Sequence, residues 1–323
     1  MELPQKVNDF IFKYNIDKEK LESTISSVRS KLSEARVEFD INSYASFGVL
    51  RLVINHPFPL QPVLFGAVEN LTKLNKYLWN DSADKWERKM LDLSDRGTFL
   101  KRKVLLSKLL NLIDKYSDES SKIIDVGFGE GVLIRELIDK GKNVFGIDMT
   151  KKFVEKQKND FSELKDHFRL LDVIDLKDKY DLVVCSMLLL DNPGVDLVLK
   201  TLPNSLLDKG KIIIVDINSK VYKAIGYYEG TKLVEVHPTD TVFYTEKEIS
   251  GHTKAVHTFH PFNYYKNTLE ELGLKCHEDF VFGPTEELIN SSKELTDKQK
   301  QRLLIELKKD INNPPFHCLV FGK

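Results

Sequence analysis

The chain has 323 residues, of which 41% are hydrophobic and 30% are charged, and its formal net charge is −1. No run approaches the ~20 consecutive apolar residues that a membrane-spanning helix needs, and the first residues lack the basic-then-apolar order of a signal peptide. The three cysteines are widely separated and form no C-x-x-C pair, so we expect reduced thiols and a cytoplasmic protein. The balance of 48 basic and 49 acidic residues disfavours a nucleic-acid partner, although a small RNA target stays open.

The first part of the chain carries no chemical motif. Residues 1–75 combine helical and strand periodicity with several prolines, and we expect an N-terminal α+β subdomain of unknown role. Residues 76–115 have helical spacing and lead into the first strong strand. Two tryptophans lie near the start of this segment, and we interpret the second, Trp86, as a core residue.

A glycine-rich turn follows, in the sequence IIDVGFGEG at residues 123–131. A short apolar run ends in Asp125, and Gly127, Gly129 and Gly131 then precede an amphipathic helical pattern. Glycine permits the close backbone approach that a ligand-binding turn needs, and the start of a helix attracts an anionic group. A dinucleotide fingerprint would place the third glycine one residue later, so the spacing disfavours an NAD-linked dehydrogenase. An ordinary connection from strand to helix is the alternative.

Four further segments are typical of buried strands. They are residues 143–148, 168–173, 180–186 and 211–216, with a turn expected at 208–210 before the last. Asp148 ends the second strand of the series, about 20 residues beyond the glycine turn, and Asp172 follows in the third. Strands that alternate with helices of ordinary length predict an α/β fold with a parallel, doubly wound sheet.

Residues 218–265 depart from this pattern. They carry nine aromatic side chains, about twice the density of the whole chain, and they start at the carboxyl end of a strand, where α/β sheets bind ligands. Aromatic walls suit a small-molecule pocket, but an ordinary hairpin is the alternative. His252, His257 and His260 lie in this segment, and their loose spacing makes a zinc site a weak hypothesis.

The end of the chain completes the sheet. We expect a helix over residues 268–272 with Gly273 as its C-cap, and then a strand over residues 276–282. Residues 285–312 are charged and helical in pattern, and residues 314–321 have the pattern of a last strand.

The order and spacing of these pieces resemble the class I S-adenosylmethionine-dependent methyltransferases, in particular the small-molecule and quinone-type group. The resemblance covers roughly residues 75–323. It implies a Rossmann-like, mostly parallel seven-stranded sheet whose last strand is antiparallel and lies between strands five and six. The methyltransferase domain would span residues 76–323. Its parts would be a cofactor half at 120–217, a substrate-side insertion at 218–265 and C-terminal strands at 274–322.

The resemblance also implies residue roles in binding S-adenosylmethionine. Asp125 would serve the methionyl amino group, Asp148 the ribose and Asp172 the adenine, while Met149 and Val173 would flank the adenine ring. The remaining candidates come from the glycine turn and the end of strand four. They are Gly127, Phe128, Gly129, Gly131 and Ser186.

The acceptor is less defined than the cofactor. His260 matches a position that is often histidine in the family and is our candidate general base, with a structural or helix-capping role as the alternative. We expect methyl transfer to an O, N or C nucleophile of a small molecule. A protein or tRNA methyltransferase, or a regulatory subunit that binds the cofactor without catalysis, are the alternatives.

Overall fold

The computed structural model describes residues 86–192, 195–218, 231–235, 241–245, 256–259, 262–309 and 314–323, and residues 19, 76, 79, 80, 83 and 84 singly. The chain divides into two compact units. The larger unit comprises Ala83–Leu189, Val195–Tyr222 and Phe262–Lys323, and it contains the sheet that the sequence predicts.

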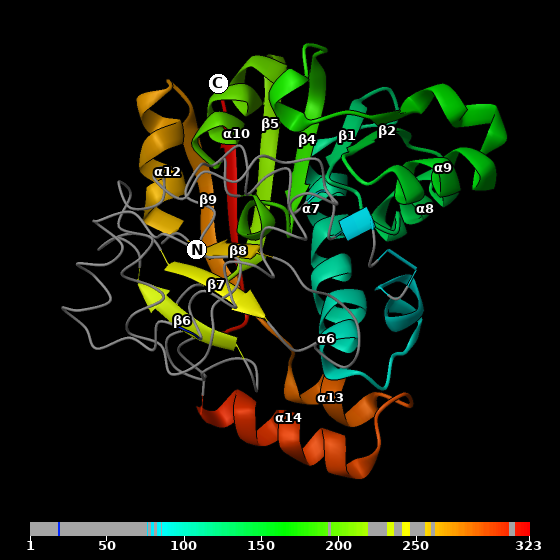
Figure 1. The fold of residues 1–323 in the computed structure, drawn as a ribbon, viewed down its shortest axis with the longest axis vertical. Coiled ribbons are helices and arrows are strands. Elements are labelled where there is room, and N and C mark those ends of the chain that lie inside the picture. Colours follow the sequence, from blue (N-terminus) through cyan, green and yellow to red (C-terminus); the bar gives the residue numbers. More distant parts are fainter. Residues whose placement is uncertain are drawn as a thin grey trace. The chain divides into compact units, whose positions relative to one another are not determined.

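The larger unit is built on a seven-stranded sheet in the order β3-β2-β1-β4-β5-β10-β9 (Figure 1). Its strands are β1 (Lys122–Val126), β2 (Asn143–Asp148), β3 (Phe168–Leu170), β4 (Tyr180–Ser186), β5 (Leu206–Ile217), β9 (Lys275–Phe282) and β10 (Phe316–Gly322). The pairs from β3 to β5 are parallel, whereas β10, drawn in red, runs antiparallel to both β5 and β9. This is the Rossmann-like class I methyltransferase arrangement, so the predicted fold is confirmed.

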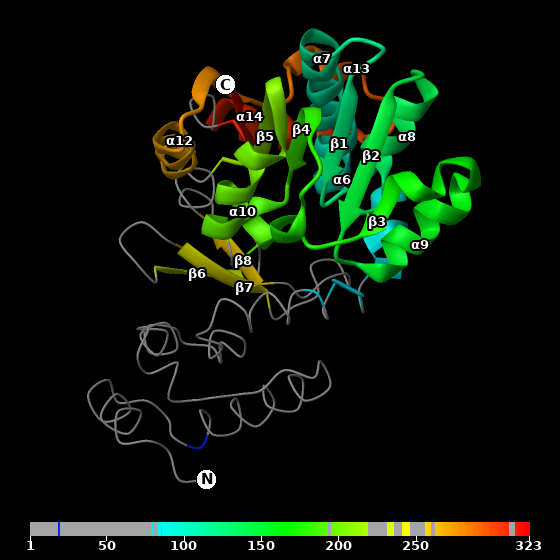
Figure 2. The same cartoon turned by 90° about the horizontal axis from the view of Figure 1, so that it is seen from above.

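Helices connect the strands and cover both faces. They are α6 (Arg96–Phe99), the π-helical η2 (Leu100–Leu105), α7 (Leu106–Tyr116), α8 (Val132–Asp139), α9 (Lys151–Asp160), α10 (Val195–Thr201), α12 (Phe262–Glu271), α13 (Glu286–Ser291) and α14 (Asp297–Lys309). Short 3₁₀ turns are η3 (Ser162–His167), η4 (Val173–Asp175), η5 (Leu189–Asp191) and η6 (Leu202–Ser205). In Figure 2, α10 and α12 lie on one side of the sheet and α7 and α8 on the other.

The core forms because alternate residues of each strand face the same layer of helices. One face packs against apolar residues of α10 and α12. Its sheet residues are Ile124, Val126, Ile147, Val183, Cys185, Ile212, Ile214, Leu319 and Phe321. The central strands are buried on both faces, which explains why they are continuous apolar runs in the sequence.

Two strand predictions need correction. The third strand ends at Leu170, not at residue 173, because Asp172 caps the 3₁₀ turn η4 by accepting a hydrogen bond from Ile174 N at 3.2 Å. The turn expected at residues 208–210 lies inside β5 as an irregularity. There the pairing moves from Tyr180 opposite Leu206 to Leu182 opposite Lys211, so β5 holds extra residues relative to β4.

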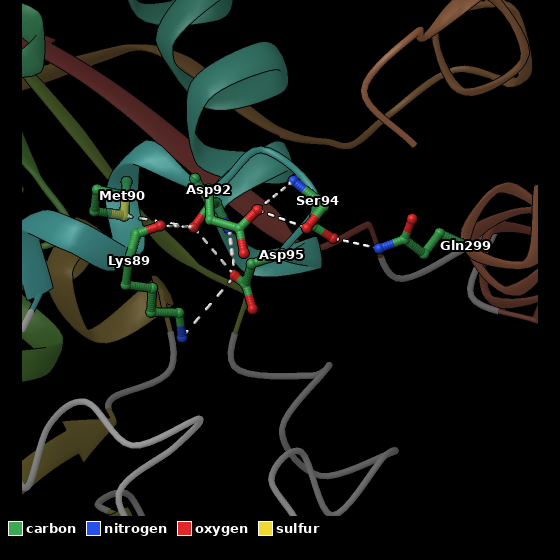
Figure 3. A network of polar contacts seen from close by, with 7 residues as sticks. Lys89, Met90, Asp92, Ser94, Asp95 and Gln299 are labelled. Carbon is green, nitrogen blue, oxygen red and sulfur yellow. Dashed lines mark hydrogen bonds and ion pairs between the residues drawn. The ribbon is translucent and has the colours of Figure 1, made fainter. Parts of the chain in front are cut away.

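The polar turn before α6 ties two distant segments together (Figure 3). Asp92 accepts hydrogen bonds from the N and Oγ of Ser94, at 3.0 and 2.6 Å. Asp95 caps α6 by accepting from Thr98 N at 2.9 Å. Gln299 of α14 donates to the carbonyl of Ser94, so the C-terminal charged insertion is anchored to this turn.

Gly273 follows α12 as the predicted C-cap, with a φ of +87°. Its N–H donates to the carbonyl of Glu270 at 3.0 Å, and no described atom lies within 4 Å of an added Cβ. Gly273→Ala should therefore cost about 1 kcal/mol of unfolding free energy, from the left-handed backbone alone. Denaturant unfolding measures this, and a loss several times larger would mean that the cap has packing partners of its own.

The smaller unit contains a three-stranded antiparallel sheet in the order β6-β7-β8. The strands are β6 (Thr231–Glu235), β7 (Thr241–Thr245) and β8 (Val256–Phe259). The hairpin alternative for the aromatic segment is thus present, whereas its role in lining a pocket stays a prediction. No helix in the described part of the chain is long and apolar enough to cross a membrane.

Candidate cofactor-binding site

Three strands end together at the carboxyl edge of the sheet. Val126 of β1 lies opposite Ile147 of β2 and opposite Cys185 of β4. The next residue on each strand therefore reaches the same level at this edge, where parallel α/β sheets bind ligands. These residues are Gly127, Asp148 and Ser186.

The glycine turn has the backbone that only glycine adopts easily. Gly127, Gly129 and Gly131 have φ values of +73°, +55° and +73°, in the left-handed region. Gly127 N donates to the carbonyl of Ile147 at 2.8 Å, which holds the turn against β2. No described atom lies within 4 Å of a Cβ added to Gly129, so the centre of the turn faces open space. This is the geometry that the sequence motif predicts.

Asp148 is buried at the end of β2 and contacts the turn directly. One carboxylate oxygen accepts from Gly129 N at 2.9 Å and the other from Thr150 N at 2.6 Å. Burial raises the pKa of this carboxyl, although the two backbone hydrogen bonds act in the opposite direction. The carboxyl is therefore held rigidly beside the glycine turn, and its remaining lone pairs could accept two hydroxyl groups.

Asp125 is 4% exposed and lies beneath the turn. Burial is the main cause that raises its pKa to about 8, and the nearby carboxylates of Asp148 and Glu130 raise it further. A buried carboxyl with such a pKa is typical of a functional site, because it is stable only when it is protonated or when it meets a cation. A ligand ammonium group would supply that cation.

The other predicted residues differ in how they are placed. Met149 and Asp172 are half-buried, and Val173 is buried at the start of η4. The Phe128 side chain is 6% exposed and packs edge-to-face on Phe168. The assignment of Met149, Asp172 and Val173 to adenine, and of Phe128 to the cofactor site, stays a prediction.

Ser186 ends β4 and is half-buried. Its neighbour Met187 has a φ of +57° and is the one non-glycine residue among those described whose backbone is left-handed. The N–H of Met187 donates to the carbonyl of Val215 at 2.8 Å. Left-handed backbone at a non-glycine residue costs free energy and is often retained at binding sites. The end of β4 is therefore a constrained part of the same edge.

Three residues near the turn, Trp86, Lys101 and Gln157, make contacts that the sequence analysis did not predict. Trp86 donates its indole N–H to the carboxylate of Glu130 at 3.0 Å, and Lys101 Nζ lies 4.3 Å from the indole ring. Trp86 is half-buried, so its interpretation as a simple core residue was wrong. Gln157 of α9 donates to the carbonyl of Glu130 at 3.0 Å. Trp86 and Gln157 lie 44 and 27 positions from Glu130 in the sequence, and no periodic pattern predicts a contact over such separations.

The candidate base, His260, lies outside the described residues. The same holds for His252, and only the backbone of His257 is described, in β8. Their roles stay predictions.

The geometry agrees with comparison to known proteins. Residues 117–267 match the family model described as a methyltransferase domain. This part, just under half of the chain, is similar to methyltransferase domains, and the strand order of the larger unit is that of the class I methyltransferase fold. S-adenosylmethionine is the cofactor that this family implies. The roles of the glycine turn, Asp125 and Asp148 in binding it stay predictions.

Individual relatives of the methyltransferase domain are distant. The ribosomal RNA small subunit methyltransferase A of Mycoplasmopsis synoviae (strain 53) is 34% identical over 74 residues, which cover 23% of this chain and only 27% of that protein. An S-adenosylmethionine-dependent methyltransferase from Mesorhizobium loti is 16% identical with a TM-score of 0.48, covering 66% of this chain and 96% of that one. A protein from Pyrococcus horikoshii OT3 is 15% identical with a TM-score of 0.49, covering 72% and 93%. The fold assignment rests on the strand order and not on these likenesses.

Proposed function

We propose that the protein transfers a methyl group from S-adenosylmethionine to an O, N or C nucleophile of a small molecule. The observation that carries the proposal is the carboxyl edge of β1 and β2, where the glycine turn meets two buried carboxyl groups, Asp125 and Asp148. These residues fit the cofactor. The open space beside Gly129 leaves room for the cofactor to approach the backbone closely. The carboxyl of Asp125, whose pKa is raised by burial, suits a cationic group of the ligand.

In this reaction the bound cofactor supplies a methyl group on a sulfonium, which is both electrophile and leaving group. The chain's own residues then have three tasks. Asp148 and the turn bind and orient the cofactor, Asp125 balances positive charge, and the protein excludes water from the nucleophile. Where the acceptor must lose a proton, His260 is the proposed base on sequence grounds alone.

Ribosomal RNA is the second candidate acceptor, because the 74-residue similarity is to an enzyme named for that substrate. Two features favour a small molecule. The chain has a net charge of −1, with 48 basic and 49 acidic residues, whereas nucleic-acid binding favours a basic surface. Strand β4 continues as Ser186-Met187-Leu188-Leu189, which lacks the Asn/Asp-Pro-Pro-Tyr pattern of many amide and base methyltransferases.

A labelling experiment separates the two acceptors. The purified protein and tritiated S-adenosylmethionine are incubated with a cell extract, which is then divided into RNA, protein and low-mass fractions. We expect tritium in a low-mass product that chromatography separates from the unreacted cofactor and that does not form without the protein. Tritium that stays with RNA would support the ribosomal candidate, and tritium on protein would support the side-chain alternative.

Replacing Asp148 by alanine should weaken binding of S-adenosylhomocysteine and leave the protein folded. A carboxylate that accepts two hydroxyl groups contributes roughly 2–3 kcal/mol through charge-assisted hydrogen bonds. Calorimetry measures the loss, and Asp139→Ala, at an exposed acid near the end of α8, is the matched control. Equal affinity in the Asp148 variant and the control would refute the ribose role.

A further inference from the structure

Gln157 is a fully buried polar residue beneath the glycine turn. It lies in α9, is 0% exposed, and donates through Nε2 to the carbonyl of Glu130 at 3.0 Å. Its Oε1 has no hydrogen-bond partner among the residues that the structure describes. An apolar residue would fill this place at less cost, since a buried acceptor without a partner destabilises the fold.

The amide of Gln157 and the third glycine of the turn fit each other. A Cβ added to Gly131 would lie 2.2 Å from Nε2 and 2.6 Å from Oε1 of Gln157. The amide therefore occupies the space that any side chain at this position would need. The left-handed φ of +73° at Gly131 brings the backbone this close to α9.

The carbonyl of Glu130 receives a second donor. Arg135 of α8 donates from Nη2 to the same oxygen, and its Nε lies 3.4 Å from the carbonyl of Gly131. On the other side of the turn, Gly129 N is bonded to Asp148. The peptide units of the turn are thus fixed at both ends, by α8 and α9 at one end and by β2 at the other.

We infer that Gln157, together with Arg135, is a positioning residue for the cofactor. The two donors fix the carbonyl of Glu130 against α8 and α9, and they thereby fix the path of the turn beside the proposed cofactor position. This inference deepens the proposed function and rests on it. It also accounts for the presence of a buried amide of which only the nitrogen, and not the oxygen, has a hydrogen-bond partner among the described residues.

Gln157→Met tests the inference, because methionine keeps the volume and removes both the donor and the unpaired acceptor. The melting temperature should change little. The Kd for S-adenosylhomocysteine should rise about three- to tenfold, the equivalent of one lost hydrogen bond. Amide hydrogen exchange at Gly129 should accelerate, which a purely structural role in the core would not cause.

Gln299→Met is the matched control, because Gln299 also donates to a backbone carbonyl, that of Ser94. It should leave the affinity and the exchange of Gly129 unchanged. If Gln157→Met does not fold, Arg135→Met removes the other donor at a half-buried position and should show the same two changes. A folded variant with wild-type affinity and wild-type exchange at Gly129 would overturn the inference. Failure of the wild type to bind S-adenosylhomocysteine would instead overturn the proposed function, and exchange at Gly129 would still test the positioning role.

Discussion

Asp125→Asn should make the protein more stable while it weakens cofactor binding. The carboxyl is 4% exposed and its pKa in the folded protein is about 8, against an ordinary value of 3.8. Below about pH 4 both the folded and the unfolded states hold the proton, so the carboxyl costs nothing. As the pH rises from 4 to 8, the unfolded state loses its proton and the folded state keeps it, so the free energy of unfolding falls.

Asparagine removes this pH dependence because it carries no titrating proton. The stability of Asp125→Asn relative to the wild type should therefore grow from near zero at pH 4 to on the order of a few kcal/mol at pH 8. Denaturant unfolding at pH 5, 7 and 9 measures the difference. A difference that is constant with pH, or largest at pH 5, would show that Asp125 is not the protonated group.

The same variant should bind S-adenosylhomocysteine less tightly. A hydrogen bond to a charged group is worth roughly 1.5–3 kcal/mol, so the Kd should rise about 10- to 100-fold.

In the wild type below pH 8, a ligand ammonium group should drive Asp125 to release its proton. Calorimetry in two buffers of different ionisation enthalpy should show that proton, and the asparagine variant should not show it. Equal proton release from both proteins would assign the proton to another group.

Gly131→Ala should be the most damaging single change in the glycine turn. The new Cβ would lie 2.2 Å from a nitrogen of the buried Gln157, at a backbone φ of +73° that alanine disfavours. Overpacking costs typically 1–3 kcal/mol, and the left-handed backbone adds roughly 1–2 kcal/mol. We expect the unfolding free energy to fall by the sum of the two.

Gly129→Ala is the matched control for backbone strain. Its φ is +55°, but no described atom lies within 4 Å of an added Cβ. It should lose only about 1–2 kcal/mol of stability. Its methyl group would enter the open space where the cofactor is proposed to lie, so affinity for S-adenosylhomocysteine should fall more than stability does. Equal losses of stability in the two variants would mean that the Gln157 side chain moves aside without lowering the unfolding free energy.

Much of the site could be predicted because its chemistry is local in sequence. Three glycines in alternation permit the left-handed turn, and an acid near the end of each apolar run lies at the carboxyl edge, as Asp125 and Asp148 do. The position of β10, antiparallel between β5 and β9, was implied by the family resemblance and not by the strand pattern itself.

The remaining features depend on contacts between distant segments. Gln157 belongs to the buried face of α9, a mostly charged helix. Its position in the sequence does not show whether the amide holds the glycine turn, as the structure shows, or is a buried polar residue without such a contact. The sequence favours a core position for Trp86 because an indole ring is largely apolar, and only the structure shows Glu130 beside its polar N–H. The turn expected at 208–210 has the residues of a turn, and it lies within β5 because Leu206 before it and Lys211 after it both pair with β4.

Calorimetric titration of the wild-type protein with S-adenosylhomocysteine and, separately, with NAD tests the central claim most directly. The spacing of the three glycines and the two buried carboxyl groups predicts binding of S-adenosylhomocysteine with a micromolar or lower Kd, on the order of −8 kcal/mol, and no measurable binding of NAD. Binding of NAD without binding of S-adenosylhomocysteine would contradict the account.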